Sequence, residues 1–291
     1  MSWSDFSKLV KLRLTFLVTF SASITFLIGS LGNVKTHGEI NWKHWIMLII
    51  GGFLVTSAAN CFNEIIEKDY DKLMRRTKDR PIPAGRMMTG QALVFGLLMA
   101  MAGTYLLGSL NLTTGLLSVF SILLYAFAYT PLKRISPIAV FVGAIPGALP
   151  PLIGYVAGHG SIDSIALIVF GIQFCWQFPH FWAIAWVLDD DYKLAGFRLL
   201  PSGKRNFSSA LVTFVLTLIL LPVSLLPTYY HYGGYYVGAV SLVCSLIFLY
   251  QAFKLLITLD IKAARQLMYG SFLYLPIVQL MFLFDFIGKV K

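Results

Sequence analysis

Charged side chains are scarce in this sequence. Only 12% of the 291 residues are Asp, Glu, Lys or Arg, whereas 57% are hydrophobic. Soluble domains usually contain roughly 45 to 50% apolar residues. The scarcity of charge therefore excludes an ordinary soluble fold and predicts a chain that lies in the lipid bilayer.

Cysteine is also scarce, and its spacing suggests no pairing. Cys61, Cys175 and Cys244 each lie alone within an apolar stretch, and the chain has no CxxC motif. We interpret all three as small buried hydrophobic residues. The sequence thus indicates neither a disulfide framework nor a thiolate metal site.

Targeting and linker signals are missing as well. The first apolar stretch has no small-residue cleavage site of the A-x-A kind, and the start of the chain is not rich in Arg and Ser. We therefore expect a retained first helix in a bacterial inner (cytoplasmic) membrane. Because no Ser/Gly-rich linker divides the sequence, residues 1–291 are predicted to form a single transmembrane domain.

Long apolar runs occupy most of the chain. A membrane-spanning helix needs about 20 mostly apolar residues. Nine such stretches occur, at residues 14–31, 44–62, 91–110, 114–130, 138–157, 164–187, 209–228, 236–256 and 267–287. We predict an all-α polytopic membrane protein with nine transmembrane helices around a central intramembrane cavity.

The positive charge of the chain is explained by its topology. If the loops alternate between two sides, one side collects all 23 basic residues except Lys35, Lys43, Lys289 and Lys291. The positive-inside rule places this basic side, together with the amino terminus, in the cytoplasm. The net charge of +10 therefore does not indicate a nucleic-acid partner, and we expect none.

One polar segment interrupts this apolar pattern. The stretch NEIIEKDYDKLMRRTKDRP, from Asn63 to Pro81, carries eleven charged residues among nineteen. Asn63, Glu67 and Asp71 are spaced four apart, which places them on one helix face. Asn60 lies one turn earlier. Two arginines that are also four apart, Arg76 and Arg80, follow the acidic residues.

Carboxylates beside paired arginines suit a diphosphate held through a divalent metal. At 4 Å a carboxylate would repel a phosphate oxygen by about 4 kcal/mol in a medium of effective dielectric near 20. Mg²⁺, which favours one or two carboxylates plus substrate phosphates, would remove this repulsion. Arg76 and Arg80 are predicted to bind the diphosphate. The alternative is a solvated helix end whose charges satisfy one another.

A second polar cluster, YTPLKRISP, begins at Tyr129. Its basic residues, Lys133 and Arg134, are either diphosphate contacts or ordinary topology anchors at the membrane surface. The next stretch, VFVGAIPGALPPLIGY, is rich in Gly and Pro, which permit close helix packing and broken helices beside a cavity. We predict that this stretch forms a wall of the intramembrane pocket.

A third polar cluster lies in QFCWQFPHFWAIAWVLDDDYKLAG, which begins at Gln173. Gln173, Gln177 and His180 form one polar stripe on an otherwise aromatic helix, and Asp191 follows at its cytoplasmic end. The aromatic surroundings suit a large flat ligand, with Gln177 and His180 as candidate contacts. A packed, hydrogen-bonded histidine is the alternative.

In these three clusters the chain resembles the UbiA-type intramembrane prenyltransferases, and within them the heme O synthases. The family pattern NxxxDxxxD followed by RTxxRP corresponds to Asn63 through Asp71 and to Arg76 through Pro81. The segments YTPLKR and WQFPHFW are similar to the heme branch. The chain departs from the family at Glu67, where aspartate is commoner, and at Leu12, where proline is usual. It also lacks the second DxxxD pattern of the quinone branch.

The resemblance implies transfer of a farnesyl group from farnesyl diphosphate to a vinyl group of heme b, giving heme O. It implies catalytic roles for Asn60, Asn63, Glu67, Asp71 and His180, and Mg²⁺ held by Asn63, Glu67, Asp71 and Asp191. Heme A synthase or terminal oxidase assembly are further candidate partners. A quinone- or chlorophyll-type prenyltransferase, and a secondary transporter, remain the alternatives.

Overall fold

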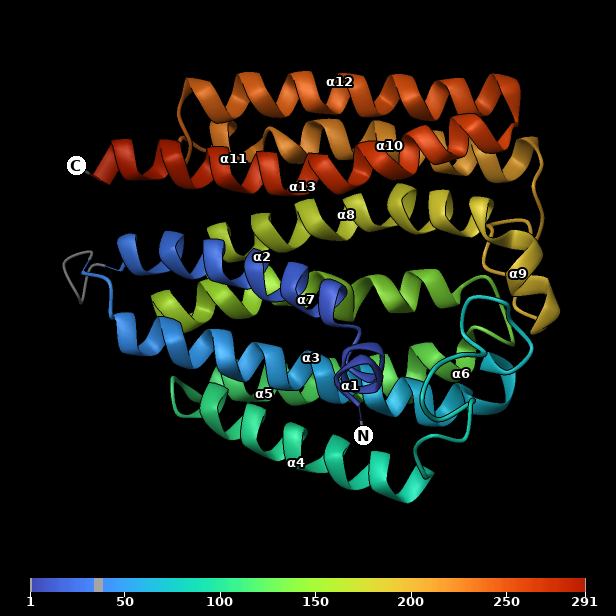
Figure 1. Cartoon of the computed structure of the whole chain (residues 1–291). Coiled ribbons are helices and arrows are strands. Elements are labelled where there is room, and N and C mark those ends of the chain that lie inside the picture. The colour runs from blue at the N-terminus through green and yellow to red at the C-terminus, as the bar shows by residue number, and fades with distance from the viewer. Residues whose placement is uncertain (1, 34–38, 291) are drawn as a thin grey trace.

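The computed structural model describes residues 2–33 and 39–290 (Figure 1). Lys35 and Lys291, used above to assign the two sides, lie outside this part of the chain. The helices are α1 (Trp3–Leu9), α2 (Leu12–Leu31), α3 (Trp42–Asp71), α4 (Thr89–Gly108), α5 (Leu112–Leu123), α6 (Thr130–Leu132), α7 (Ala139–His159), α8 (Ser164–Val187), α9 (Asp189–Leu194), α10 (Phe207–Ser224), α11 (Leu226–Tyr229), α12 (Tyr235–Thr258) and α13 (Ile261–Val290). A π-helical turn, η2 (Leu124–Tyr129), joins α5 to α6.

The described residues contain nine helical segments that are long and apolar enough to span a membrane. They coincide with the nine stretches expected from hydropathy, so the all-α, nine-span prediction is confirmed. The second span, α3, runs 30 residues to Asp71 and so carries its polar extension as continuous helix. Which end of the bundle faces the cytoplasm stays a prediction.

Polar residues mark where several of these helices begin. The side chains of Asn41, Asn111, Asp163 and Asn206 accept hydrogen bonds from backbone N–H groups in the first turns of α3, α5, α8 and α10. Such caps satisfy N–H groups that have no partner within the helix. Single Asn or Asp residues between apolar runs therefore mark where these four spans start.

Four helices form the centre of the bundle. α2 packs on α7, α7 on α8, α8 on α13, and α13 closes the ring by contacting α2. α3, α4 and α5 lie on one side of this ring, and α10 and α12 lie on the other (Figure 1). The ring thus joins an N-terminal and a C-terminal group of helices.

Glycine allows α2 and α7 to approach closely. A Cβ atom on Gly154 of α7 would lie 2.0 Å from the backbone oxygen of Ala22, and one on Gly29 of α2 would lie 2.3 Å from that of Tyr155. Neither distance is physically possible, so only glycine fits. The expectation of close packing in the Gly/Pro-rich segment is borne out at this contact.

The polar connections gather at one end of the bundle. The loop between α3 and α4, the short helix α6 and helix α9 lie together there, whereas the carboxyl end of the chain lies at the opposite end (Figure 1). Three clusters that are far apart in the sequence are thereby brought to the same end.

Candidate active site

Four polar residues of α3 project from its last three turns. Asn60, Asn63, Glu67 and Asp71 are all buried, with at most 5% of each residue exposed. Buried polar groups must find partners, because leaving them unpaired costs free energy. Their partners define the site.

Three of these residues are each contacted by a cation from a different segment. Lys11 Nζ donates to Asn63 Oδ1 at 2.7 Å, and Arg80 Nη1 donates to Asp71 Oδ2 at 2.6 Å. Lys133 forms an ion pair with Glu67. The carboxylates and cations are therefore one buried cluster, assembled from the N-terminal segment, the loop after α3 and the residue that follows α6.

Lys11 is held in an unusual backbone conformation at the start of α2. Its φ of 50° lies in the left-handed region, which disfavours residues other than glycine. Asn60 Nδ2 fixes this bend by donating to Val10 O at 3.2 Å and to Thr15 Oγ1 at 3.3 Å. Desolvation, together with the nearby Arg80 and Lys133 cations, lowers the pKa of Lys11 to about 7. An anion bound at the cluster would favour its charged form.

The positive charge of Lys133 is better compensated than that of Lys11, because Lys133 forms an ion pair with Glu67. Burial pulls the pKa of Lys133 down, but the charge and hydrogen bond of Glu67, together with Tyr125 and Tyr192, raise it above the usual lysine value. Its ammonium nitrogen also lies 4.8 Å from the centre of the Tyr129 ring. Lys133 is therefore held in the interior of the cluster by the Glu67 carboxylate and the Tyr129 ring.

Thr130 orients the amide of Asn63. Asn63 Nδ2 donates to Thr130 Oγ1 at 3.0 Å, so the amide oxygen points to Lys11. The Thr130 hydroxyl in turn donates to Tyr125 O, five residues earlier, across the π-helical turn η2. Such turns often occur at functional sites because they re-aim side chains.

Three predicted site residues make different contacts at the edge of the cluster. Arg76 is exposed. The guanidinium of Arg134 lies over the Tyr70 ring, 4.0 Å from its centre. Asp191 accepts the backbone N–H groups of Arg75 at 2.8 Å and Arg76 at 3.4 Å, so it ties α9 to the loop after α3. Their roles as ligands stay predictions.

The cluster has the donor chemistry that Mg²⁺ requires. The Oδ1 atom of Asp71 is buried and has no hydrogen-bond partner among the described residues. Glu67 lies one turn away on the same helix. The described chain contains no group of three or more His, Cys, Asp or Glu residues that could hold a metal. The two carboxylates fit a magnesium ion that takes its remaining ligands from substrate phosphates and water.

The polar stripe of α8 divides into two parts. Gln173 joins Ser21 of α2, Gln279 of α13 and the backbone oxygen of Gly147 of α7 in one hydrogen-bonded network, at distances from 2.7 to 3.2 Å. Each helix of the central ring thus contributes one group. Gln177 lies directly against Gly147, where a Cβ atom would come within 2.0 Å of its amide nitrogen.

His180 lies between α8 and α13. Its Nδ1 atom is 2.7 Å from Ser271 Oγ. Trp176 stacks on its ring with centroids 4.3 Å apart, and Phe272 of α13 meets it edge-on at 5.3 Å. The imidazole is therefore positioned by a hydrogen bond and by aromatic rings.

Aromatic rings connect His180 to the charged cluster. The ring of Phe181 lies 5.7 Å from that of His180 and 6.4 Å from that of Tyr129, and Tyr129 in turn lies beneath Lys133. A continuous aromatic wall, from Tyr129 through Phe181 to His180, thus links the Lys133 end of the charged cluster to an imidazole. Such a wall suits a cationic or flat conjugated group.

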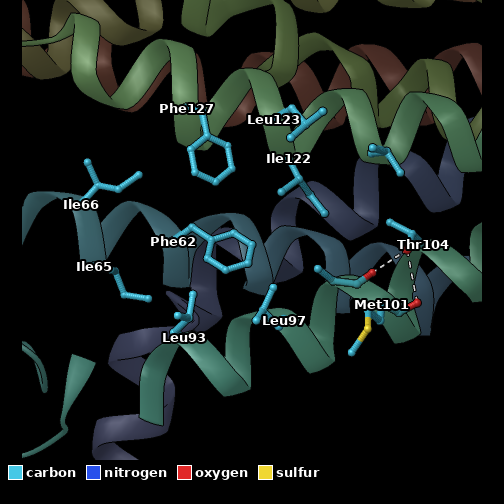
Figure 2. Close-up of a pocket in the computed structure, with 12 residues that line it drawn as sticks. Phe62, Ile65, Ile66, Leu93, Leu97, Met101, Thr104, Ile122, Leu123 and Phe127 are labelled. Atoms are coloured by element: carbon cyan, nitrogen blue, oxygen red, sulfur yellow. Dashed lines mark hydrogen bonds between the residues drawn. The ribbon is translucent and has the colours of Figure 1, made fainter. Parts of the chain in front are cut away.

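An apolar hollow of about 370 Å³, which includes neither the charged cluster nor His180, lies between α3, α4 and the α5–η2 segment. Figure 2 shows Phe62, Leu97, Ile122 and Phe127 around it. Its one polar lining residue, Thr104, directs its hydroxyl to backbone oxygens of its own helix. The hollow therefore offers no ligand for a metal or a diphosphate.

Sequence reasoning missed several of these groups. The charge pattern identifies Lys11 only as one of the basic residues of the predicted cytoplasmic side, although it stands immediately before the first span. Thr130 lies inside the YTPLKR segment but was not singled out. Ser271 and Gln279 are isolated polar residues in the last apolar span, and buried polar groups in a membrane are often functional. That signal was available for both.

The sequence of the chain is similar to those of known proteins. The model of the UbiA prenyltransferase family matches residues 22–276. The chain is 44% identical over 280 residues to a protoheme IX farnesyltransferase of Cytophaga hutchinsonii, covering 96% of each chain. It is 39% identical over 285 residues to the protein of the same name from Flavobacterium johnsoniae, covering 97% of this chain and 94% of that one.

Solved structures share the fold. A digeranylgeranylglyceryl phosphate synthase superposes with a TM-score of 0.81 at 20% identity, covering 98% of both chains. A UbiA homolog from Archaeoglobus fulgidus, bound to GPP and Mg²⁺, superposes with a TM-score of 0.62 at 12% identity, covering 96% of this chain and 99% of that one. At these identities the likeness concerns the fold alone.

Proposed function

This chain belongs to the UbiA prenyltransferase family, and we propose that it transfers a farnesyl group from farnesyl diphosphate to a vinyl group of heme b, giving heme O and diphosphate. The names of the relatives supply the two substrates. The observation that carries the proposal in this chain is the aromatic wall that joins the Lys11, Arg80 and Lys133 cluster to His180. The wall supports the proposal that a leaving-group site and an acceptor-type site share one fold.

The charged cluster supplies the leaving-group chemistry. Glu67 and Asp71 would hold Mg²⁺, with Asn63 presenting its amide oxygen beside them. Bound there, the ion would supply charge neutralisation to the departing diphosphate. Lys11, Arg80 and Lys133, which contact the polar face of α3, would stabilise the same charge. In this proposal Arg76, Arg134 and Asp191 contribute from the edge once substrate is present.

The aromatic wall receives the other product of ionisation. In this proposal the rings of Tyr129, beside Lys133, and of Phe181, 6.4 Å from the Tyr129 ring, would receive the allylic cation, because aromatic faces stabilise cations. The cation alkylates the electron-rich vinyl group, and water then adds to the resulting carbocation next to the porphyrin and loses a proton, which leaves a hydroxyl group. Burial within the bundle keeps water from quenching the first cation.

His180, with Gln177 one turn earlier, belongs to the acceptor end in this proposal. A central intramembrane cavity between the cluster and His180 is part of it, as are the single-domain organisation and a cytoplasmic active site in a bacterial inner membrane. Contact with heme A synthase or with terminal oxidase assembly is a further prediction. The hydrogen-bonded groups at the centre of the ring, Ser21, Gln173 and Gln279, are uncharged, which favours an enzyme over an ion-coupled transporter.

Incubation of the purified protein with farnesyl diphosphate, heme b and Mg²⁺, followed by mass analysis of the porphyrin, tests the proposal. We expect a porphyrin enlarged by one farnesyl group and one hydroxyl group. A parallel incubation with a hydroxylated aromatic acid in place of heme b tests the quinone-type alternative. Prenylation of that acid, with heme b left unmodified, would overturn the assignment.

A further inference from the structure

Ser271 and His180 form a hydrogen bond whose direction can be assigned. Ser271 is fully buried, and its Oγ atom lies 2.7 Å from His180 Nδ1 and 2.6 Å from the backbone oxygen of Met268. A carbonyl oxygen can only accept, so the single hydroxyl hydrogen of Ser271 points to Met268. Ser271 Oγ must then accept from His180, and Nδ1 carries the ring hydrogen.

This assignment leaves the other ring nitrogen unprotonated. A neutral imidazole carries one N–H, so with the hydrogen on Nδ1 the Nε2 atom presents a free lone pair. Within residues 2–33 and 39–290, Nε2 has no hydrogen-bond partner. An imidazole whose remote N–H is bound to an oxygen, and whose second nitrogen is free, is the usual state of a metal-ligating histidine.

The same serine also orients the surroundings of the imidazole. Trp176 Nε1 donates to the backbone oxygen of Ser271 at 3.0 Å, and Trp176 stacks on the His180 ring at an interplanar angle of 17°. Phe272, the residue after Ser271, meets the ring at 72°. One turn of α13 thus fixes both the tautomer of His180 and the rings around it.

We propose that His180 Nε2 is an axial ligand of the heme iron and that Ser271 is the positioning residue that fixes this tautomer. The inference rests on the proposed function, because it takes heme b as the acceptor. Among three roles for His180, the inference favours ligation of the iron over a hydrogen bond to the porphyrin and over proton exchange at the vinyl group. Ligation would anchor the macrocycle at the end of the aromatic wall that begins beneath Lys133.

Heme binding to the purified full-length chain tests the proposal without turnover. The protein in lipid nanodiscs is titrated with ferric heme b, then reduced, and its iron–histidine stretch is recorded by resonance Raman spectroscopy. We expect this band in the wild-type protein and its loss in His180→Ala, with recovery on addition of free imidazole. In Ser271→Ala we expect the band at lower frequency, because Nδ1–H loses its acceptor, and a heme affinity roughly 10- to 100-fold weaker.

Ser245→Ala is the matched control. It removes a buried helix hydroxyl that bonds to Ser224 and Tyr274 and does not contact His180, so heme affinity and the band should be unchanged. Binding of inorganic diphosphate with Mg²⁺ reports that each variant is folded. An iron–histidine band that persists in His180→Ala overturns the ligation. A Ser271→Ala variant with wild-type band position and affinity overturns the positioning role.

Different results would contradict the iron ligation by His180 and the farnesyl transfer to heme b. If the wild-type protein makes heme O but shows no histidine-ligated heme, the ligation is wrong and the farnesyl transfer stands. If it shows the His180-dependent band but makes no heme O from farnesyl diphosphate, the transfer is wrong and the iron site stands.

Discussion

The ammonium group of Lys11 donates a 2.7 Å hydrogen bond to the side-chain oxygen of Asn63, across 52 positions of sequence. The bond joins the segment before the first span to the polar face of α3. With Lys133 at Glu67 and Arg80 at Asp71, it completes a row of three cations along three residues of α3 that are spaced four apart. The diphosphate site proposed here is therefore closed by a residue from the start of the chain.

Lys11→Met should lower the rate of heme O formation by roughly 10² to 10³, because a preorganised cation is lost from the leaving group. Binding of Mg²⁺-diphosphate should weaken in parallel, which calorimetry measures. Arg13→Met is the control, since Arg13 is an exposed cation two positions later. Equal activity of the two variants would remove Lys11 from the site.

Glu67→Gln and Asp71→Asn should each weaken Mg²⁺ activation, because a neutral amide is a poorer magnesium ligand than a carboxylate. The measurement is turnover as a function of Mg²⁺ concentration, in which both variants should require more metal. Asp69→Asn changes an exposed carboxylate of the same helix, paired with Lys72, and should leave the Mg²⁺ requirement unchanged. An unaltered requirement in all three variants would return the cluster to a structural role.

The two arginines of the loop after α3 should differ in effect. The Arg80 side chain is only 13% exposed and bonds to Asp71, whereas Arg76 is exposed. We expect Arg80→Ala to reduce turnover by roughly 10² or more and Arg76→Ala to reduce it less. Steady-state kinetics at varied farnesyl diphosphate concentration measures both. A larger loss for Arg76 would indicate that the loop rearranges around the substrate.

Gln173→Leu should destabilise the central ring, because Gly147 O, Ser21 and Gln279 all lose a partner. Polar contacts inside membranes contribute about 1 kcal/mol, so we expect the free energy of unfolding to fall by about that amount per lost bond. Denaturant unfolding in mixed micelles measures the change. Gln266→Leu, at an exposed position of α13, should be neutral, and equal stability of the two variants would contradict the role of the network.

The polar end of the bundle should face the cytoplasm. In a background without Cys61, Cys175 and Cys244, a cysteine at exposed Lys78 should react with an impermeant maleimide only from the cytoplasmic side. A cysteine at exposed Ile162, between α7 and α8, should react from the other side. Labelling of position 78 from outside alone would reverse the orientation.

Local sequence was sufficient for the fold class. Nine apolar runs of spanning length, with single Asn or Asp residues at several of their starts, determined where the helices lie, because backbone groups in a membrane must be paired within the segment. Periodicity of the residues also placed Asn63, Glu67 and Asp71 on one face of α3, since that relation depends only on helix geometry.

Tertiary packing alone decided the partners of these residues. The pairing of Lys11 with Asn63 depends on a left-handed bend that Asn60 holds against α3, and no local pattern contains it. Asp191 lies at the loop after α3, and Ser271 reaches His180 across 91 residues, only because α9 and α13 pack where they do. Helix formation depends on residues that are close together in the sequence. The tautomer of His180 and the cations that contact α3 depend instead on which helices pack together in the folded protein.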